Sequence, residues 1–106
     1  MQIHITGHQI EVTAALRQHV EEKIVKFPRL FDNLTSFNVV LAVEKLEHKA
    51  EGTLAASGRV LHAVDVKSDM YASIDGMVDK LVAQLRKHKE KLKDHHQAEA
   101  RQERYG

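Results

Sequence analysis

The chain contains no cysteine, no tryptophan and a single proline among its 106 residues. Without cysteine there can be no disulfide, thiolate metal site or thiol nucleophile, and the composition fits a reducing compartment. No apolar run approaches the roughly 18 residues of a membrane span. The N-terminal MQIHIT lacks the basic segment and apolar region of a secretory signal. The sequence therefore predicts a cytoplasmic protein with no membrane partner.

Aromatic residues are also scarce, at 5% of the chain. No strand carries the K/R-G-F/Y-G/A-F-V-x-F/Y pattern on which RNA recognition motifs stack bases, and no two glycines have the GxxG spacing of a KH domain. The chain has no G-x-S-x-G, no glycine-rich phosphate loop and no H-E-x-x-H. The scarcity of aromatic residues and the missing motifs disfavour recognition of single-stranded RNA by base stacking. They also predict a protein that is not an enzyme and has no cofactor or small-molecule substrate.

Charge is abundant but unevenly placed. The formal net charge of the chain is only +1, yet residues 80–93 contain six cations and one anion and carry +5. Residues 14–29 carry +2, whereas residues 30–79 carry −4. The sequence thus predicts a dipolar molecule whose helices are basic and whose sheet and loops are acidic.

The basic segment has an ordinary explanation, because cations near a helix C-terminus stabilise it by about 0.3–1 kcal/mol each. Two like-charge pairs four residues apart, Lys87–Lys91 and Lys89–Lys93, oppose that explanation, since each costs about 0.2–0.5 kcal/mol. The pattern instead favours a surface for a polyanion such as nucleic-acid phosphate. With stacking disfavoured, recognition of the backbone and shape of structured RNA is the expected mode.

Hydrophobic periodicity predicts four strands and two helices in the order β-α-β-β-β-α. The expected strands are residues 2–6, 37–44, 51–57 and 60–67, with a break at Gly7, a polar turn at 47–49 and a hairpin turn at Gly58-Arg59. We expect Thr13 to cap the first helix and Pro28 to end it. The apolar stripe of this helix is Leu16, Val20, Ile24 and Phe27.

The second helix is predicted to span residues 70–94, after a cap at Ser68 or Asp69. Its apolar stripe is Ile74, Val78, Leu81, Leu85, His88 and Leu92. Such a helix is about 37 Å long, more than a four-stranded sheet covers, so its C-terminal end should project. We expect residues 1–95 to form one α+β two-layer sandwich, similar to double-stranded-RNA-binding domains, with both helices on one sheet face. Residues 96–106 are expected to be a flexible C-terminal tail.

The segments MQIHITGHQIEVTAALRQHVEEKI and DMYASIDGMVDKLVAQLRKHKEKL resemble the ribosome hibernation promoting factor and ribosome-associated inhibitor family in its short form, most like the short hibernation promoting branch. The resemblance runs from Met1 to about His95 and implies the same β-α-β-β-β-α fold. It further implies binding to the small ribosomal subunit in the messenger RNA and tRNA channel near the decoding centre. Translation would be blocked sterically, and inactive ribosome dimers would be stored with a second ribosome-modulating factor in stationary phase or stress.

The resemblance also implies which residues contact ribosomal RNA. Carried over from the family motif, they are Lys23, Lys26, Lys80, Arg86, Lys87, Lys89 and Lys91. The charge pattern adds Arg29 and Lys93 to this rRNA-binding set. The alternative hypothesis is a stand-alone binder of structured RNA or of an acidic protein partner.

Three other features receive structural interpretations. Among eight histidines, none belongs to a closed ligand set, so the sequence predicts no functional metal site and at most adventitious binding at His88, His95 and His96. Tyr71 is expected to have a structural role, either in the core or in holding the strand-to-helix turn. Ser73 lies within the family pattern as an ordinary variation.

Overall fold

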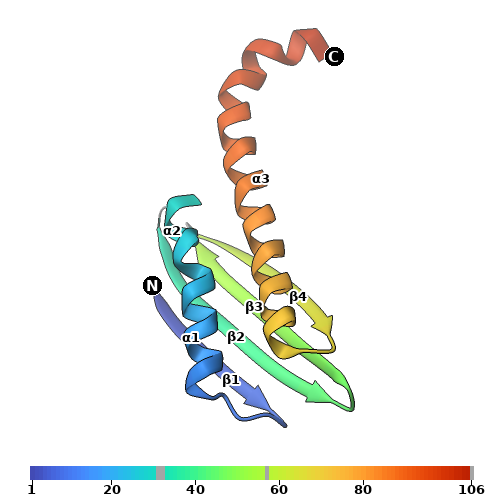
Figure 1. Ribbon diagram of the computed structural model, residues 1–106. Helices are drawn as coiled ribbons and strands as arrows, with labels where there is room; N and C mark the ends of the chain where they lie inside the picture. The colour runs from blue at the N-terminus through green and yellow to red at the C-terminus, as the bar shows by residue number, and fades with distance from the viewer. Residues whose placement is uncertain (31–32, 57, 106) are drawn as a thin grey trace.

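The computed structural model describes the backbone of residues 1–30, 33–56 and 58–105, and the side chains of these segments as far as Lys87. Four strands, β1 (Gln2–His8), β2 (Leu34–Glu44), β3 (Glu47–Ala56) and β4 (Arg59–Lys67), form one sheet in the order β1-β2-β3-β4. Strand β1 pairs parallel with β2, and the other pairs are antiparallel. The helical segments are α1 (Ala14–Lys23), η1 (Ile24–Lys26), α2 (Phe27–Leu30) and α3 (Met70–Tyr105). All of them lie on one face of the sheet, which confirms the predicted α+β sandwich (Figure 1).

The segment that leads from β1 through α1 to α2 has the predicted order of elements, but the strand and the helix end at other residues than predicted. Strand β1 continues through Gly7 to His8, and a Cβ added at Gly7 would clash with the carbonyl oxygen of Ile10 where the chain turns back. Thr13 caps α1 as expected, its Oγ1 accepting from the N–H of Leu16 at 3.1 Å. The expected helix end at Pro28 is wrong. Pro28 lies in the first turn of α2, where its missing N–H removes no helical hydrogen bond.

The two hairpins also differ from the sequence prediction. Strand β3 already begins at Glu47, so the turn expected at 47–49 falls earlier, next to Lys45, whose φ is 56°. Strand β3 is ten residues long, against the seven expected at 51–57, because it pairs with both β2 and β4. At the next turn Gly58 has φ 75°, which glycine adopts without strain. Arg59 pairs with Ala56 and is the first residue of β4.

The core fills the space between the sheet and the helices. The predicted stripes are confirmed where side chains are described, because the following residues are buried: Leu16, Val20, Ile24, Phe27, Ile74, Val78, Leu81 and Leu85. Helix α3 packs directly on β3. A Cβ added at Gly52 would lie 2.5 Å from Met77 Sδ and 3.1 Å from Phe37 Cε1, so glycine permits this close approach.

Helix α3 is longer than predicted. It runs for 36 residues to Tyr105 rather than ending at Asp94, which corresponds to about 54 Å. Its C-terminal part extends well past the sheet, as expected (Figure 1). The side chains of His88 and Leu92, assigned to the apolar stripe, lie outside the described residues. The flexible tail at 96–106 stays a prediction.

Ser73 holds the junction between the sheet and α3. Its side chain is fully buried, and its Oγ accepts from the N–H of Lys67 at 3.0 Å and donates to the carbonyl of His48 at 2.6 Å. These bonds join the end of β4, the start of β3 and the first turn of α3. The Ser73 hydroxyl therefore has a structural role that its place in the family pattern did not indicate.

Side chains of α3 also reach the outer edge of the sheet. Lys80 Nζ donates to the carbonyl of Val64 at 2.6 Å, and Gln84 Nε2 donates to the carbonyl of His62 at 2.9 Å. Strand β4 is an edge strand, so these carbonyls face away from β3. The helix thus satisfies two acceptors that the sheet leaves open.

Candidate nucleic-acid interface

The charges of the helical layer divide into two groups along α3. Residues 24–30 and 81–87 contain no acidic side chain, and we name them the basic end. Its four cations are Lys26, Arg29, Arg86 and Lys87. Residues 14–23 and 69–80 contain three cations and five anions, a net charge of −2 with His19 neutral, and we name them the acidic end.

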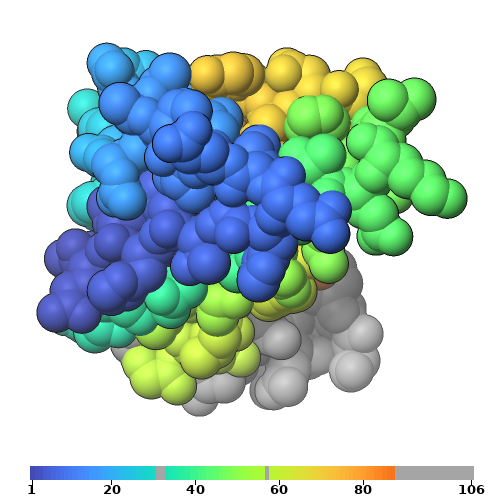
Figure 2. Space-filling view, turned by 90° about the horizontal axis from the view of Figure 1, so that it is seen from below, coloured from blue at the N-terminus to red at the C-terminus, as the bar shows by residue number. Residues whose placement is uncertain are grey.

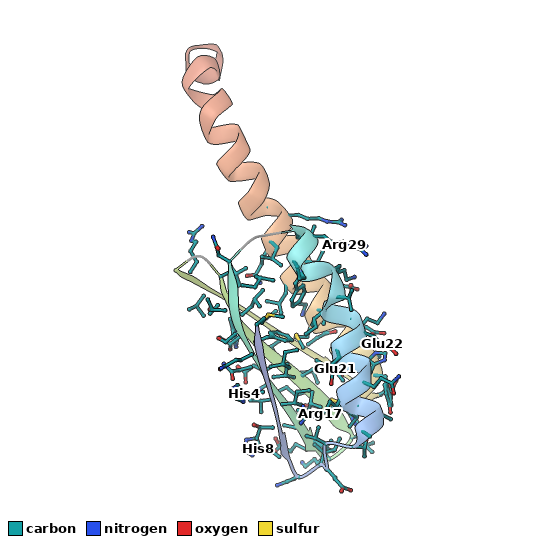
Figure 3. All side chains as sticks on the ribbon, turned by 90° about the vertical axis from the view of Figure 1, so that its left-hand side faces the viewer. His4, His8, Arg17, Glu21, Glu22 and Arg29 are labelled. Atoms are coloured by element: carbon teal, nitrogen blue, oxygen red, sulfur yellow. The ribbon has the colours of Figure 1, made fainter. Side chains whose placement is uncertain are left out.

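The two groups are separate in space as well as in sequence. Short helix α2 contacts α3 and lies beside its middle, whereas α1 lies beside its first turns (Figure 1). Seen from below, α1 in blue and the start of α3 in gold lie next to each other (Figure 2). Arg29 lies at the end of α2, and Arg17, Glu21 and Glu22 lie farther back along α1 (Figure 3).

The four cations of the basic end differ in exposure but share the absence of an ion-pair partner among the described residues. Arg29, Arg86 and Lys87 are exposed, and Lys26 is half-buried. Within the described part of the chain, none of the four makes an ion pair. Phe27 and Leu85 are fully buried beneath them, which fixes both helical segments to the core. A preformed group of unpaired cations of this kind can bind phosphate by releasing its counterions.

The acidic end contains a cluster that joins α1 to α3. Asp75 Oδ1 lies 2.6 Å from His19 Nε2 and 3.6 Å from Lys23 Nζ. The rings of His19 and Tyr71 meet edge to face, with centroids 5.0 Å apart. Tyr71 therefore contacts α1 through His19 at the surface, since it is 38% exposed, and is not a core residue. Asp69, one of the two caps considered, accepts from the N–H of Ala72 through Oδ2 at 3.3 Å.

A second cluster surrounds Asp65 on β4. Its Oδ2 lies 3.1 Å from Lys67 Nζ and its Oδ1 lies 3.3 Å from Lys80 Nζ. A Cβ added at Gly76 would clash with this carboxylate, so α3 accommodates it with glycine. Burial raises the pKa of Asp65, but the hydrogen bonds with Lys67 and Lys80 outweigh burial and hold the pKa below its ordinary value of 3.8. The carboxylate is thus charged at neutral pH.

The structure separates the nine cations that the sequence grouped together. Four form the basic end, whereas Lys23 and Lys80 are paired with aspartates at the acidic end. The remaining predicted side chains lie outside the described residues: Lys89, Lys91, Lys93, and the histidines His88, His95 and His96. The rRNA-binding set therefore stays a prediction, with four of its cations gathered at the basic end and two held in ion pairs.

Sequence reasoning missed the counter-ions Asp65 and Asp75. Asp65 lies 15 residues from its partner Lys80, and Asp75 lies 56 residues from its partner His19. The sequence gives one sign of them, the excess of aspartate before and within the start of α3, but this excess does not show which cation each aspartate pairs with.

Among the described residues, no three histidine or acidic side chains gather as a metal site, and no helix is long and apolar enough to cross a membrane.

Comparison with known proteins places this fold and surface in context. The family described as sigma 54 modulation protein / S30EA ribosomal protein matches residues 3–93. The chain belongs to this family. Among relatives of this S30EA chain, the ribosome hibernation promoting factor of Escherichia coli (strain K12) is 48% identical over 95 residues, covering 90% of the chain and 100% of the relative. That of Azotobacter vinelandii is 54% identical over 91 residues, covering 86% and 85%.

Solved structures agree with the S30EA assignment. The N-terminal domain of Thermus thermophilus Protein Y superposes with a TM-score of 0.78 at 30% identity, over 83% of this chain and 99% of that one. A ribosomal subunit interface protein from Coxiella burnetii gives 0.75 at 26% identity, over 84% and 98%. The family resemblance and the fold predicted from the sequence are confirmed.

Proposed function

We propose that this protein is a ribosome hibernation factor that binds the small ribosomal subunit in the messenger RNA and tRNA channel near the decoding centre. Membership of the S30EA family and relatives named ribosome hibernation promoting factor support this role. The observation that carries it is the basic end, four cations without an ion pair in the described residues, held on a packed core.

The proposed mechanism is occlusion and involves no covalent chemistry. The contact set begins with the basic end and extends along α3 to Lys89, Lys91 and Lys93, which add to the basic charge of the same helix. Both helical segments are fixed to the sheet through Phe27 and Leu85, so little conformational entropy is lost when the cations meet phosphate. A folded domain held in the channel excludes messenger RNA and tRNA by its volume.

The proposal includes the storage of inactive ribosome dimers together with a second ribosome-modulating factor in the cytoplasm. The names of the curated relatives support a role in ribosome hibernation, and the dimers and the second factor are part of the proposal. In that role the protein regulates translation during stationary phase or stress by withdrawing ribosomes from use.

The test compares two RNA partners. Purified small subunits and a naked RNA duplex are titrated with the protein at several salt concentrations, and messenger RNA with tRNA is then added as competitor. We expect much tighter binding to subunits than to duplex, and displacement by the competitors. Equal affinities with equal salt slopes would instead support a stand-alone binder of structured RNA.

A further inference from the structure

The charged groups of the helical layer are not equally available to RNA. We infer that Asp75 and Asp65 act as internal counter-ions, which withhold Lys23 and Lys80 from phosphate and so restrict RNA contact to the basic end and to the part of α3 that follows it. This inference rests on the proposed function, because it specifies which part of the helical layer makes the contact. It removes two lysines from the set that the family motif implies and gives two aspartates a role in specificity.

For Lys23 the argument is local charge balance. Its Nζ lies 3.6 Å from Asp75 Oδ1, and both side chains are 40% exposed. A phosphate that approaches this ammonium also approaches the carboxylate, so attraction and repulsion nearly cancel. A phosphate that displaced Asp75 would have to separate it from His19, whose Nε2 lies only 2.6 Å away. Lys23 therefore contributes little net attraction for a polyanion.

For Lys80 the argument is the use of its donors. An ammonium has three N–H donors, and Lys80 directs one to the carbonyl of Val64 at 2.6 Å and one to Asp65 Oδ1 at 3.3 Å. Asp65 is only 7% exposed, so losing this partner would leave a buried carboxylate poorly compensated. Lys80 is thus held against β4 by its bonds to Val64 and Asp65, although its side chain is half exposed.

Lys87 is the matched opposite of Lys23. It is exposed, and it has no ion-pair partner in the described residues. Neutralising a lysine that contacts phosphate lowers the slope of log affinity against log salt by about 0.7–0.9. Over a fourfold range of salt, that slope change corresponds to about a threefold change in affinity.

The experiment measures salt slopes for the full chain and its variants on an RNA duplex and on small subunits. We expect Lys87→Gln to reduce the magnitude of the salt slope by about 0.7–0.9, and Lys23→Gln to reduce this magnitude by less than half as much. Lys80→Gln should lower the melting temperature while changing the slope as little as Lys23→Gln. Asp75→Asn should raise the slope by releasing Lys23, and the double variant Asp75→Asn/Lys23→Gln should return it to the parent value.

Several outcomes would overturn the inference: a slope loss for Lys23→Gln or Lys80→Gln equal to that for Lys87→Gln, or an unchanged or lower slope for a folded Asp75→Asn. If Asp75→Asn does not fold, the comparison of Lys23→Gln with Lys87→Gln still decides. Failure of the proposed function has a different signature, because the parent protein would then bind subunits no better than duplex. In that case the salt slopes of the variants on duplex RNA could still be compared, and they would still test the inference.

Discussion

The basic end and the acidic end each combine part of the first helical region, residues 14–30, with part of α3, but their charges are used in opposite ways. At the acidic end and the neighbouring part of β4, Asp75 and Asp65 pair with three lysines and one histidine in contacts that join α1 to α3 and β4 to α3. At the basic end, the four cations make no ion pair among the described residues. Charge at one end holds the molecule together, and charge at the other is left for a partner.

This difference separates two kinds of mutational effect. Changes at the acidic end and its junction with the sheet should alter stability and leave RNA affinity nearly intact. Changes at the basic end should alter RNA affinity and leave stability nearly intact, because its cations make no ion pair within the described residues whose loss could destabilise the fold.

The largest effect is expected from reversing one arginine at the basic end. Arg29→Glu removes a phosphate contact and adds a repulsive charge, so binding to small subunits should weaken about 10–100-fold at physiological salt. Arg17→Glu is a matched control, because Arg17 is also an exposed arginine but lies on α1, at the acidic end. It should weaken binding by less than about threefold. Equal losses in a co-sedimentation assay would break the comparison.

A smaller effect, on stability alone, is expected at Ser73. Ser73→Ala leaves the N–H of Lys67 and the carbonyl of His48 without their buried partner. The free energy of unfolding in urea should fall by about 1–3 kcal/mol. Ser68→Ala, at an exposed position, should stay within about 0.5 kcal/mol of the parent. A change in the salt slope of RNA binding for Ser73→Ala would contradict the division.

The smallest expected effect is the pH dependence contributed by Asp65. Its pKa in the folded protein lies below the ordinary 3.8, so its carboxylate stabilises the fold above about pH 4. That stabilisation is lost as the pH falls through the folded-state pKa. Because the two lysine partners are half exposed, each ion pair contributes about 0.2–1 kcal/mol.

The variant Asp65→Asn isolates this contribution from the other carboxylates. Unfolding free energies of parent and variant, measured by urea denaturation from neutral to acid pH, should differ at neutral pH and converge in acid. Curves that stay parallel throughout the titration would show that Asp65 does not stabilise the fold through its charge.

Much of the fold could be predicted because it depends on local pattern. The stripe of α1 and the first half of the α3 stripe were predicted, as was the Thr13 cap, because each depends on residues a few positions apart. Boundaries that depend on a neighbouring strand were missed. Residues 47–49 are polar enough for a turn, yet all three pair with β2, and His48 and Lys49 also pair with β4, so they lie within a strand.

The candidate site was predictable in composition but not in arrangement. Sequence alone indicated where cations are dense and that the helices carry them. It could not show that Lys23 meets Asp75 or that Lys80 meets Asp65, because those pairings need tertiary contacts between α1, α3 and β4. Nor could it show the importance of Ser73, whose hydroxyl bonds the backbone of residues 6 and 25 positions away.

The bonds from α3 to the outer edge of β4 have a consequence for self-association. A second chain adding a strand to β4 would find the carbonyls of His62 and Val64 already accepting from Gln84 and Lys80. It would also meet the half-exposed ammonium of Lys80 along the edge. Charged side chains and covered edges are common defences against strand-to-strand aggregation. Helix α3, which carries part of the basic end, thus also opposes strand-to-strand polymerisation at the β4 edge when the protein is concentrated.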